Sequence, residues 1–436
     1  MRSICISIVA TLVLAGTAKS DSEQNGGYTH HSISIESLQL GEVVGQISID
    51  LPRNRLVGPT QLTTGFHANG IFTMDLDSGE LQVGYSDDTQ SRTEAYAALA
   101  INTATNTWYT YDSPPDQSAP QEIIAINGST GEATRVALPN ENLWMVYEGA
   151  MYVDEDRNQV YVVCDAAATV DPRVIVLDGA TNTWLPHQFD LEQWPGYGYD
   201  VSFAAIPTAD RLYIGITNQL TLVDMATSTV LNHIEVGGSI TGIDTDRGTH
   251  GGRIYVACTD PNGHAGHATL YEMNAETLAI NRTLTQLPAV SKDVFWNPHD
   301  DHVYVAGNNG NWSGKPCNAH SGISVVGFTH FKLIDWIPLD HIEGSLCGNG
   351  TSTYASFGQI LEQSPPIGCI SQNAFQELDF SAPLAGDLDA DGDVDSDDLS
   401  QLHSELGICH SDVNHDGATN IDDLLLLMDG WNSVCP

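Results

Sequence analysis

Two acidic segments near the C-terminal end of this 436-residue chain have residue types and spacings that could bind metal ions. One runs from Asp387 to Asp398 and the other from Asp412 to Asp423. Ca²⁺ takes about six to eight oxygen ligands, and a loop of about twelve residues can supply them from its positions 1, 3, 5, 7, 9 and 12. Gly392 and Gly417 stand at the sixth position, where glycine permits a sharp turn. The sequence therefore predicts two calcium sites, and the doubled spacing argues against an acidic tail without metal.

The expected ligands are side-chain oxygens, except at position 7, which contributes its main-chain carbonyl. In chain order they are Asp387, Asp389, Asp391, Asp393, Asp395 and Asp398 for one ion, and Asp412, Asn414, Asp416, Ala418, Asn420 and Asp423 for the other. Each loop leads into an amphipathic helix, expected over residues 399–406 and 424–431.

Paired loop-helix units with Asp at position 12 and the lead-in Gly386-Asp387 resemble the type I dockerin family. Members of that family attach secreted bacterial proteins, often polysaccharide-degrading enzymes, to cohesin modules. The resemblance implies a small all-α domain over 385–436, two bound Ca²⁺ ions and a cohesin-like partner. The loops begin only 25 residues apart, at 387 and 412, and positions 10 and 11 read Ser396-Asp397 and Ile421-Asp422 instead of the usual small hydroxyl residues. Calcium binding therefore carries over to this chain better than cohesin binding does.

Other features of the sequence predict that the protein is exported. Residues 1–20 have the pattern of a signal peptide, with Arg2, an apolar core and a small-x-small site at Ala18-Lys19-Ser20. No later stretch is long and apolar enough to span a bilayer, so we expect a secreted bacterial protein, extracellular or associated with the cell surface, without membrane insertion. Asp and Glu outnumber Lys and Arg by 56 to 15, which disfavours nucleic-acid and membrane partners.

Between the signal peptide and the acidic loops, the chain repeats itself about every fifty residues. Tyrosines recur at 109, 161, 213, 255, 304 and 354, within segments such as Val160-Tyr-Val-Val and Leu212-Tyr-Ile-Gly. Four short strands per repeat, joined by Gly, Asn and Asp turns, are typical of a β-propeller. The units resemble the blades of YVTN or quinoprotein-like propellers.

We count six clear units, with orphan strands at 32–35 and 43–49 near one end and at 354–361 near the other. A closed ring leaves no long sheet edge exposed, so the fold expected is mainly β, with a seventh blade completed from both ends. Six or eight blades are the alternatives. The domains expected are the propeller over 21–362, a linker over 363–384, in which 375–380 could form a strand, and the dockerin-like domain.

Seven cysteines remain after Cys5 is assigned to the signal peptide. Cys409 and Cys435 flank the second calcium loop, where a disulfide would stabilise the fold by about 3 kcal/mol, and Cys317 with Cys347 is a second candidate pair. Cys164 and Cys258 occupy equivalent positions in units separated by a whole blade. That separation is too large for a disulfide, so both are predicted to be unpaired core residues.

The repeat also selects residues at the mouth of the central channel. Glu94, Glu148, Asp200 and Asp293 fall near the start of the innermost strand of their units. They could bind a metal or a cationic ligand, or act as the carboxylate pair of a glycoside hydrolase; the alternative is a solvated channel rim. Trp144, Trp194, Tyr197 and Trp312 are expected on the same face, where they either stack on sugar rings or pack between blades.

His264, His267 and His320 are either a metal site or solvated loop residues, because no carboxylate or Cys completes the ligand set. No catalytic motif is recognisable. The sequence thus favours a recognition or scaffold protein that binds a glycan or a protein. A polysaccharide-degrading enzyme, either a glycoside hydrolase or a lyase, and a structural cell-surface protein are the alternatives.

Overall fold

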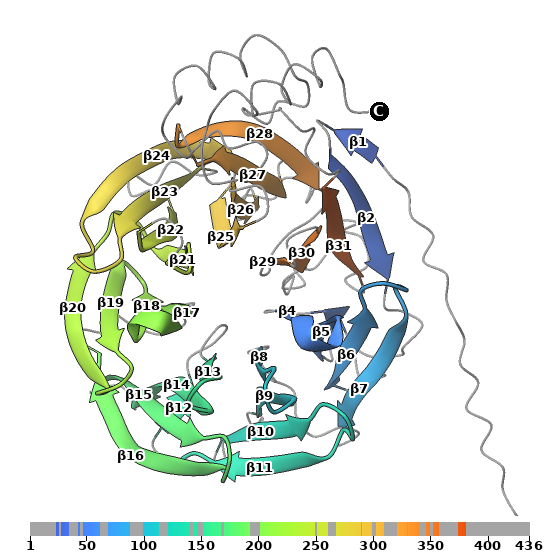
Figure 1. Ribbon diagram of the computed structural model, residues 1–436, viewed down its shortest axis with the longest axis vertical. Coiled ribbons are helices and arrows are strands. Elements are labelled where there is room, and N and C mark those ends of the chain that lie inside the picture. The colour runs from blue at the N-terminus through green and yellow to red at the C-terminus, as the bar shows by residue number, and fades with distance from the viewer. Residues whose placement is uncertain are drawn as a thin grey trace, which may run out of the picture.

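The computed structural model describes residues 23–25, 28–34, 42–43, 47–61, 69–87, 99–112, 121–139, 143–145, 151–166, 170–191, 201–248, 251–259, 267–288, 290–298, 302–308, 321–328, 330–339, 346–348, 352–356 and 374–380. Antiparallel sheets stand around a central axis as the blades of a β-propeller (Figure 1). The predicted propeller fold is therefore confirmed.

Six blades are built from strands that are consecutive in sequence. Blade 1 contains β3 (Glu42–Val43), β4 (Ser48–Asp50), β5 (Arg55–Gln61), β6 (Asn69–Asp75) and β7 (Leu81–Asp87). Blade 2 contains β8 (Leu99–Asn102), β9 (Thr107–Asp112), β10 (Glu122–Asn127) and β11 (Ala133–Ala137). Blade 3 contains β12 (Leu143–Met145), β13 (Met151–Asp154), β14 (Gln159–Ala166), β15 (Val170–Asp178) and β16 (Thr183–Asp190).

Blade 4 contains β17 (Val201–Ile206), β18 (Arg211–Ile216), β19 (Gln219–Asp224) and β20 (Thr229–Glu235). Blade 5 contains β21 (Ile240–Thr245), β22 (Arg253–Thr259), β23 (His267–Asn274) and β24 (Ile280–Pro288). Blade 6 contains β25 (Val290–Asn297), β26 (His302–Asn308), β27 (Ser321–Gly327) and β28 (Lys332–Leu339). In blades 1 and 3 two short strands share the innermost position, because β3 and β4 both pair with β5, and β12 and β13 both pair with β14.

A further sheet joins the two ends of the chain. Its strands are β29 (Leu346–Gly348), β30 (Ser352–Ser356), β31 (Ala374–Phe380), β2 (Tyr28–Ser34) and β1 (Glu23–Asn25), paired in that order. In Figure 1 the blue β2 runs beside the dark red β31, between blade 6 and blade 1. Within this sheet, β29 contacts β25 of blade 6 and β4 of blade 1, and β31 contacts β3 of blade 1. The expected pairing of the two chain ends is thus present in this composite sheet, but the segment 43–49, expected to take part in it, instead contributes to β3 and β4 of blade 1. The strand suggested within the linker 363–384 is β31, so the sheet extends past residue 362, because β31 pairs with both β30 and β2.

The repeated tyrosine marks the second strand of a blade and packs toward the next blade. Tyr109, Tyr161, Tyr213, Tyr255 and Tyr304 are fully buried on β9, β14, β18, β22 and β26. Tyr161 shares a core cluster with Leu212 and Ile214 of blade 4, and Tyr213 shares one with Ile254 and Val256 of blade 5. Each such aromatic ring removes a large apolar surface from water at a blade interface. The core is therefore a series of layers between blades.

The turns between first and second strands repeat with equal regularity. Asn54, Asn106, Asn158 and Asp210, each 52 positions after the last, have φ between 50° and 58°. Asn and Asp tolerate this left-handed conformation better than other non-glycine residues. In blades 1 and 4 the turn begins with a short 3₁₀ helix, η2 (Leu51–Arg53) or η3 (Pro207–Ala209).

Both described cysteines outside the composite sheet behave as predicted. Cys164 and Cys258 form no disulfide and are fully buried in β14 and β22. Burial raises the pKa of the Cys258 thiol to about 12, so it stays protonated at neutral pH. Both residues are parts of the apolar layers. The pairing of Cys409 with Cys435 and of Cys317 with Cys347 lies outside the described side chains.

Candidate functional site

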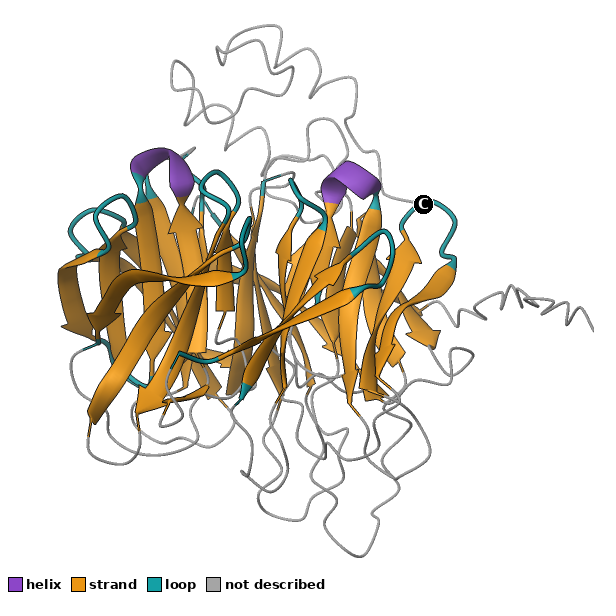
Figure 2. Ribbon diagram, turned by 90° about the horizontal axis from the view of Figure 1, so that it is seen from below, coloured by secondary structure: helices purple, strands orange, loops and turns teal. Residues whose placement is uncertain are grey.

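The propeller has two different faces. The connections between first and second strands and between third and fourth strands lie at one end of the blades, and most are short turns; we call this end the turn face. Figure 2 shows both 3₁₀ helices and the short turns on this side of the ring. Because the strands are antiparallel, the connections from second to third strands and from blade to blade start from the opposite end, the loop face.

The candidate binding and catalytic residues of the propeller fall mostly in segments between the described strands. Glu94, Glu148 and Asp200, together with Trp194, Tyr197 and Trp312, lie outside the described residues. Trp144 is in β12 opposite Asp165 of β14, and its side chain lies outside the described part. The expected carboxylate cluster is therefore represented by Asp293 alone among the described side chains.

Asp293 is the fourth residue of β25, the innermost strand of blade 6. Its side chain is half-buried, and its Oδ1 accepts a hydrogen bond from the main-chain N–H of Val294 at 2.8 Å. It thus lies on the innermost strand, but in the middle of that strand and not near its start, where the sequence had placed it. A role in binding or catalysis stays a prediction.

The metal sites expected from the sequence also fall mainly outside the described residues. This holds for all twelve calcium ligands between Asp387 and Asp423, and for His264 and His320. His267 is exposed at the start of β23, with Nδ1 at 3.3 Å from the carbonyl oxygen of Leu287. In the described part of the chain, no group of three or more His, Cys, Asp or Glu side chains is placed to hold a metal ion.

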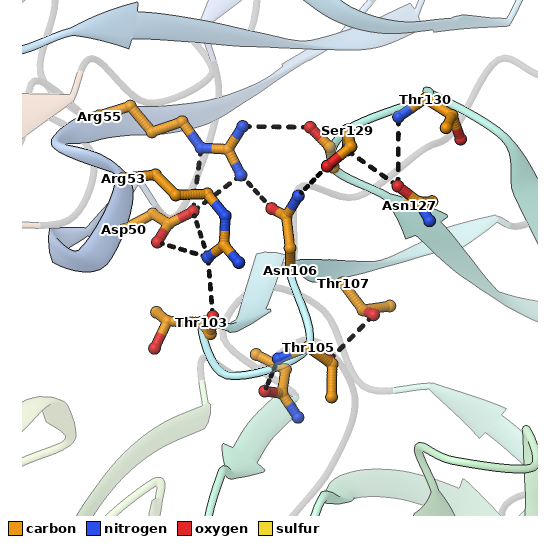
Figure 3. Close-up of polar contacts among 12 residues, drawn as sticks. Asp50, Arg53, Arg55, Thr103, Thr105, Asn106, Thr107, Asn127, Ser129 and Thr130 are labelled. Carbon is orange, nitrogen blue, oxygen red and sulfur yellow. Dashed lines mark hydrogen bonds and ion pairs between the residues drawn. The ribbon is translucent and has the colours of Figure 1, made fainter.

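On the turn face, charged side chains connect neighbouring blades. Figure 3 shows this for blades 1 and 2, where the buried Asp50 accepts hydrogen bonds from Arg55 at 2.7 and 2.9 Å and from Arg53 at 3.2 Å. Arg55 also reaches blade 2, donating to the carbonyl oxygen of Gly128 at 3.1 Å and to Asn106. Asp50 therefore orients a guanidinium group that links two blades.

Similar contacts continue around the ring. Asn102 of blade 2 donates to Asn158 of blade 3 at 2.7 Å, and the main-chain N–H of Thr103 donates to Glu155 at 2.7 Å. Arg157 of blade 3 pairs with Asp154 of its own blade at 2.8 Å and with Asp210 of blade 4. Arg211 of blade 4 pairs with Glu276 of blade 5 at 3.1 Å. Four of the described arginines, Arg53, Arg55, Arg157 and Arg211, thus contact a neighbouring blade.

Blades 5 and 6 are joined by two half-buried arginines that share one buried carboxylate. Glu272, on β23, is almost fully buried and accepts hydrogen bonds from Arg253 at 3.3 Å and from Arg282 at 3.0 Å. The Arg253 guanidinium lies 4.4 Å from the ring centre of Phe328 in blade 6, and Arg282 donates to the Phe328 carbonyl oxygen at 2.8 Å. Two cations that share one carboxylate and an aromatic face form a strong contact in a low-dielectric interface.

Closest to the axis, the structure identifies an acid that the sequence did not suggest. Asp244 is half-buried on β21, the innermost strand of blade 5. Its Oδ1 accepts from the N–H of Thr245 at 2.8 Å, and its Oδ2 accepts from the N–H of Trp296 in blade 6 at 2.7 Å. Desolvation raises the pKa of Asp244 to about 6, although Arg247 and the two N–H groups oppose this shift.

In sequence, the segment Asp244-Thr-Asp-Arg-Gly is typical of a polar turn, whereas the strand register pairs Asp244 with the repeat tyrosine Tyr255. The same register pairs Tyr152 with Tyr161 in blade 3 and Phe295 with Tyr304 in blade 6. In blades 2 and 4 this position holds Ala100 and Ala204, so a carboxylate among aromatic residues and alanines was the signal that could have identified it.

Two aromatic residues lie at the corresponding interface of blades 3 and 4. The rings of Tyr152 on β13 and Phe203 on β17 are stacked, with centroids 6.2 Å apart, and both are half-buried on innermost strands. Burial and the nearby Asp154 and Glu155 raise the pKa of Tyr152. This pair packs the inner part of the blade interface.

In the described residues, no helix is both long and apolar enough to cross a membrane. No protein-family model matches the sequence, and no curated protein does so either.

Proposed function

We propose that this chain is a secreted, non-catalytic recognition protein whose propeller binds a glycan or a protein ligand on its loop face. The observation that supports this is that the two faces of the propeller carry different kinds of residues. Arginine and acidic side chains of the turn face are engaged in contacts between blades, as at Arg55, Arg157 and Arg211. The connections that carry Trp194, Tyr197 and Trp312 start from the opposite ends of the same strands. A rigid ring that holds variable loops is the usual arrangement of a binding face.

The composite sheet supports a ring of seven blades, and we propose that it acts as the seventh. Its three inner strands come from the C-terminal side and its outer strands from the N-terminal side, which would fasten the chain ends together. Closure of this kind removes exposed sheet edges between blade 6 and blade 1.

The binding proposal is tested with residues 21–436 on an array of plant and bacterial polysaccharides. We expect binding that falls at least about tenfold, or about 1.4 kcal/mol, when Trp194 and Trp312 are replaced by Ala, because stacking on sugar rings is lost. The matched control is Arg211→Ala on the turn face, which should retain binding. Binding that the tryptophan variants leave unchanged would contradict the proposal. Release of reducing sugar from a bound polysaccharide would favour a glycoside hydrolase instead.

We also propose that residues 385–436 form a dockerin-like attachment module stabilised by two Ca²⁺ ions, with a cohesin-like protein as its partner. The two loops with matching ligand positions support this. Isothermal titration of metal-free full chain should give two bound Ca²⁺ ions, and Asp387→Asn should remove one of them. Asp397→Asn, at a position without a ligand role, is the control. A stoichiometry near zero, or equal losses in the two variants, would refute the assignment.

A further inference from the structure

The connections on the loop face differ in length around the ring. In blade 4 two residues, 217–218, join the second strand to the third, and four residues, 236–239, lead on to blade 5. The corresponding connections of blade 6 have twelve residues, 309–320, and six, 340–345. A two-residue connection stays close to the strand ends, whereas a longer one has the length to extend away from them. Blade 4 has less connecting chain on this face than any of the other five blades.

The short connections of blade 4 are held in place by the start of blade 5. We call residues 217–218, 236–239 and Thr259 the low sector. The N–H of Ser239 donates to Oγ1 of Thr259 at 2.9 Å, and the N–H of Thr259 donates to the carbonyl oxygen of Ser239 at 2.9 Å. Gly238, with a φ of 87°, lies so close to Thr259 that an added Cβ would overlap the Thr259 carbonyl oxygen. The low sector is therefore a preformed surface that bridges two blades.

The two-residue turn of the low sector is strained. Thr217 has a φ of 52°, in the left-handed region that a β-branched residue seldom adopts. Its carbonyl oxygen accepts a hydrogen bond from the N–H of Ile240 in blade 5, and its Oγ1 lies 3.4 Å from Oδ1 of the exposed Asn218. Such strain persists where the surrounding contacts maintain it, and it is concentrated at ligand-binding sites.

The side chains of the low sector are polar and uncharged. Asn218 and Ser239 are exposed and Thr259 is half-buried, and Ser239 makes both bonds to Thr259 through its main chain, not through its hydroxyl. Among the described residues at the loop-face ends of blades 4 and 5, Glu235 is the one acid, and Lys and Arg are absent, although the whole chain has 56 acids. Amide and hydroxyl groups both donate and accept hydrogen bonds, as the hydroxyl groups of sugars do.

The low sector is poorly suited to a protein partner. Protein interfaces depend on large apolar or aromatic side chains that become buried at their centre. The exposed large apolar side chains of the described residues all lie elsewhere, at Leu51, Val83, Val230, Leu231, Ile280 and Leu333. The low sector therefore matches a neutral sugar chain better than a protein surface.

We propose that the ligand of the loop face is a neutral polysaccharide chain that runs outward over the low sector, where Asn218, Ser239 and Thr259 bind its hydroxyl groups. This inference rests on the proposed binding at the loop face. In Figure 1 the strands β17 to β20 of blade 4 lead from the axis to the rim of the ring, so the low sector follows a path from the channel mouth to solvent. The connection 191–200, which contains Trp194, leads directly into β17.

The test uses residues 21–436 and oligosaccharides of increasing length, prepared from the polysaccharide that binds on the array. Calorimetry should show affinity that rises with length. Asn218→Ala should lower the affinity for the longest oligosaccharide about fivefold, because a hydrogen bond is lost, and leave that for the shortest one that binds within about twofold. Trp194→Ala should weaken both. The matched control is Asn281→Ala, an exposed asparagine on the outermost strand of blade 5, which should bind as the wild type.

A second variant blocks the path without removing a side chain. Four Gly and Ser residues inserted between Thr217 and Asn218 should weaken binding of the longest oligosaccharide at least about tenfold and spare the shortest. The same insertion between Ala226 and Thr227, on the turn face of blade 4, should have no effect on binding. If the first insertion does not fold, Asn218→Ala decides the matter.

The outcomes separate this inference from the proposed function. Wild-type affinity in Asn218→Ala at every length, or a ligand that proves to be a protein, would overturn the path over the low sector and leave binding at the loop face intact. Unchanged affinity in Trp194→Ala would count against the loop-face site itself. If no polysaccharide binds, the inference is wrong.

Discussion

Replacement of Glu272 by Gln is expected to lower the free energy of unfolding by about 3–5 kcal/mol, because it leaves two guanidinium groups without their shared carboxylate. Glu272 is buried and accepts from Arg253 and Arg282. Neither arginine can lose its charge, and Gln would present an NH₂ group or a weaker acceptor to them. The cations would remain over the rings of Phe328 and Phe331 without their counter-charge. The junction of blades 5 and 6 would therefore weaken.

Urea unfolding of the full chain, followed by tryptophan fluorescence, measures this change as a lower midpoint at a similar slope. The matched control is Glu276→Gln in the same blade, where the Glu276 side chain is 59 % exposed and pairs with Arg211. An exposed pair contributes at most about 1 kcal/mol, so this variant should unfold near the wild-type midpoint. Equal losses in the two variants would show that the buried group has no special importance.

Replacement of Tyr213 by Ala is the second change with a large expected effect, about 3–5 kcal/mol in the free energy of unfolding. The ring is fully buried between blades 4 and 5, and its hydroxyl donates to the carbonyl oxygen of Ala275 at 3.0 Å. Truncation would leave a cavity between two blades and a buried carbonyl without its donor. Tyr213→Phe keeps the ring and loses only the hydrogen bond, so it should cost about 1 kcal/mol.

Thermal and urea unfolding of both variants against the wild type provide the comparison. The ratio of the two losses tells whether the repeated tyrosine acts mainly through its ring or through its hydroxyl. A loss in Tyr213→Phe as large as that in Tyr213→Ala would contradict the packing argument. Because Tyr161 makes the corresponding contact with the carbonyl oxygen of Met225, at 3.4 Å, Tyr161→Ala should repeat the result at the junction of blades 3 and 4.

The blades could be predicted because the residues that define each blade lie within one repeat of the sequence. Alternation of apolar residues, the left-handed turn residues and the tyrosine on each second strand all fall within one repeat, so spacing alone identified them. The absence of a disulfide between Cys164 and Cys258 followed from the same spacing, since equivalent positions in separated blades cannot meet. The pairing of the chain ends was predictable because a ring with unpaired edge strands is unfavourable.

Contacts between blades were harder to predict from the sequence. Arg55 meets Gly128, 73 positions away, and Arg282 meets the carbonyl oxygen of Phe328, 46 positions away, so no local pattern records either contact. In sequence, Asp244 resembles a turn residue because Asp246 and Gly248, which follow it, are typical of turns. Its burial depends on the close approach of β25, about fifty residues away in sequence, which Gly242 permits.

By itself, then, the sequence determined the repeating unit, the class of fold and the spacing of the predicted calcium ligands, since each depends on residues within one short segment. Only the tertiary structure decided which charges pair between blades and which carboxylate becomes desolvated. The physical reason is that ion pairing and pKa depend on distance and burial in space, and these arise only when the ring brings separate repeats together.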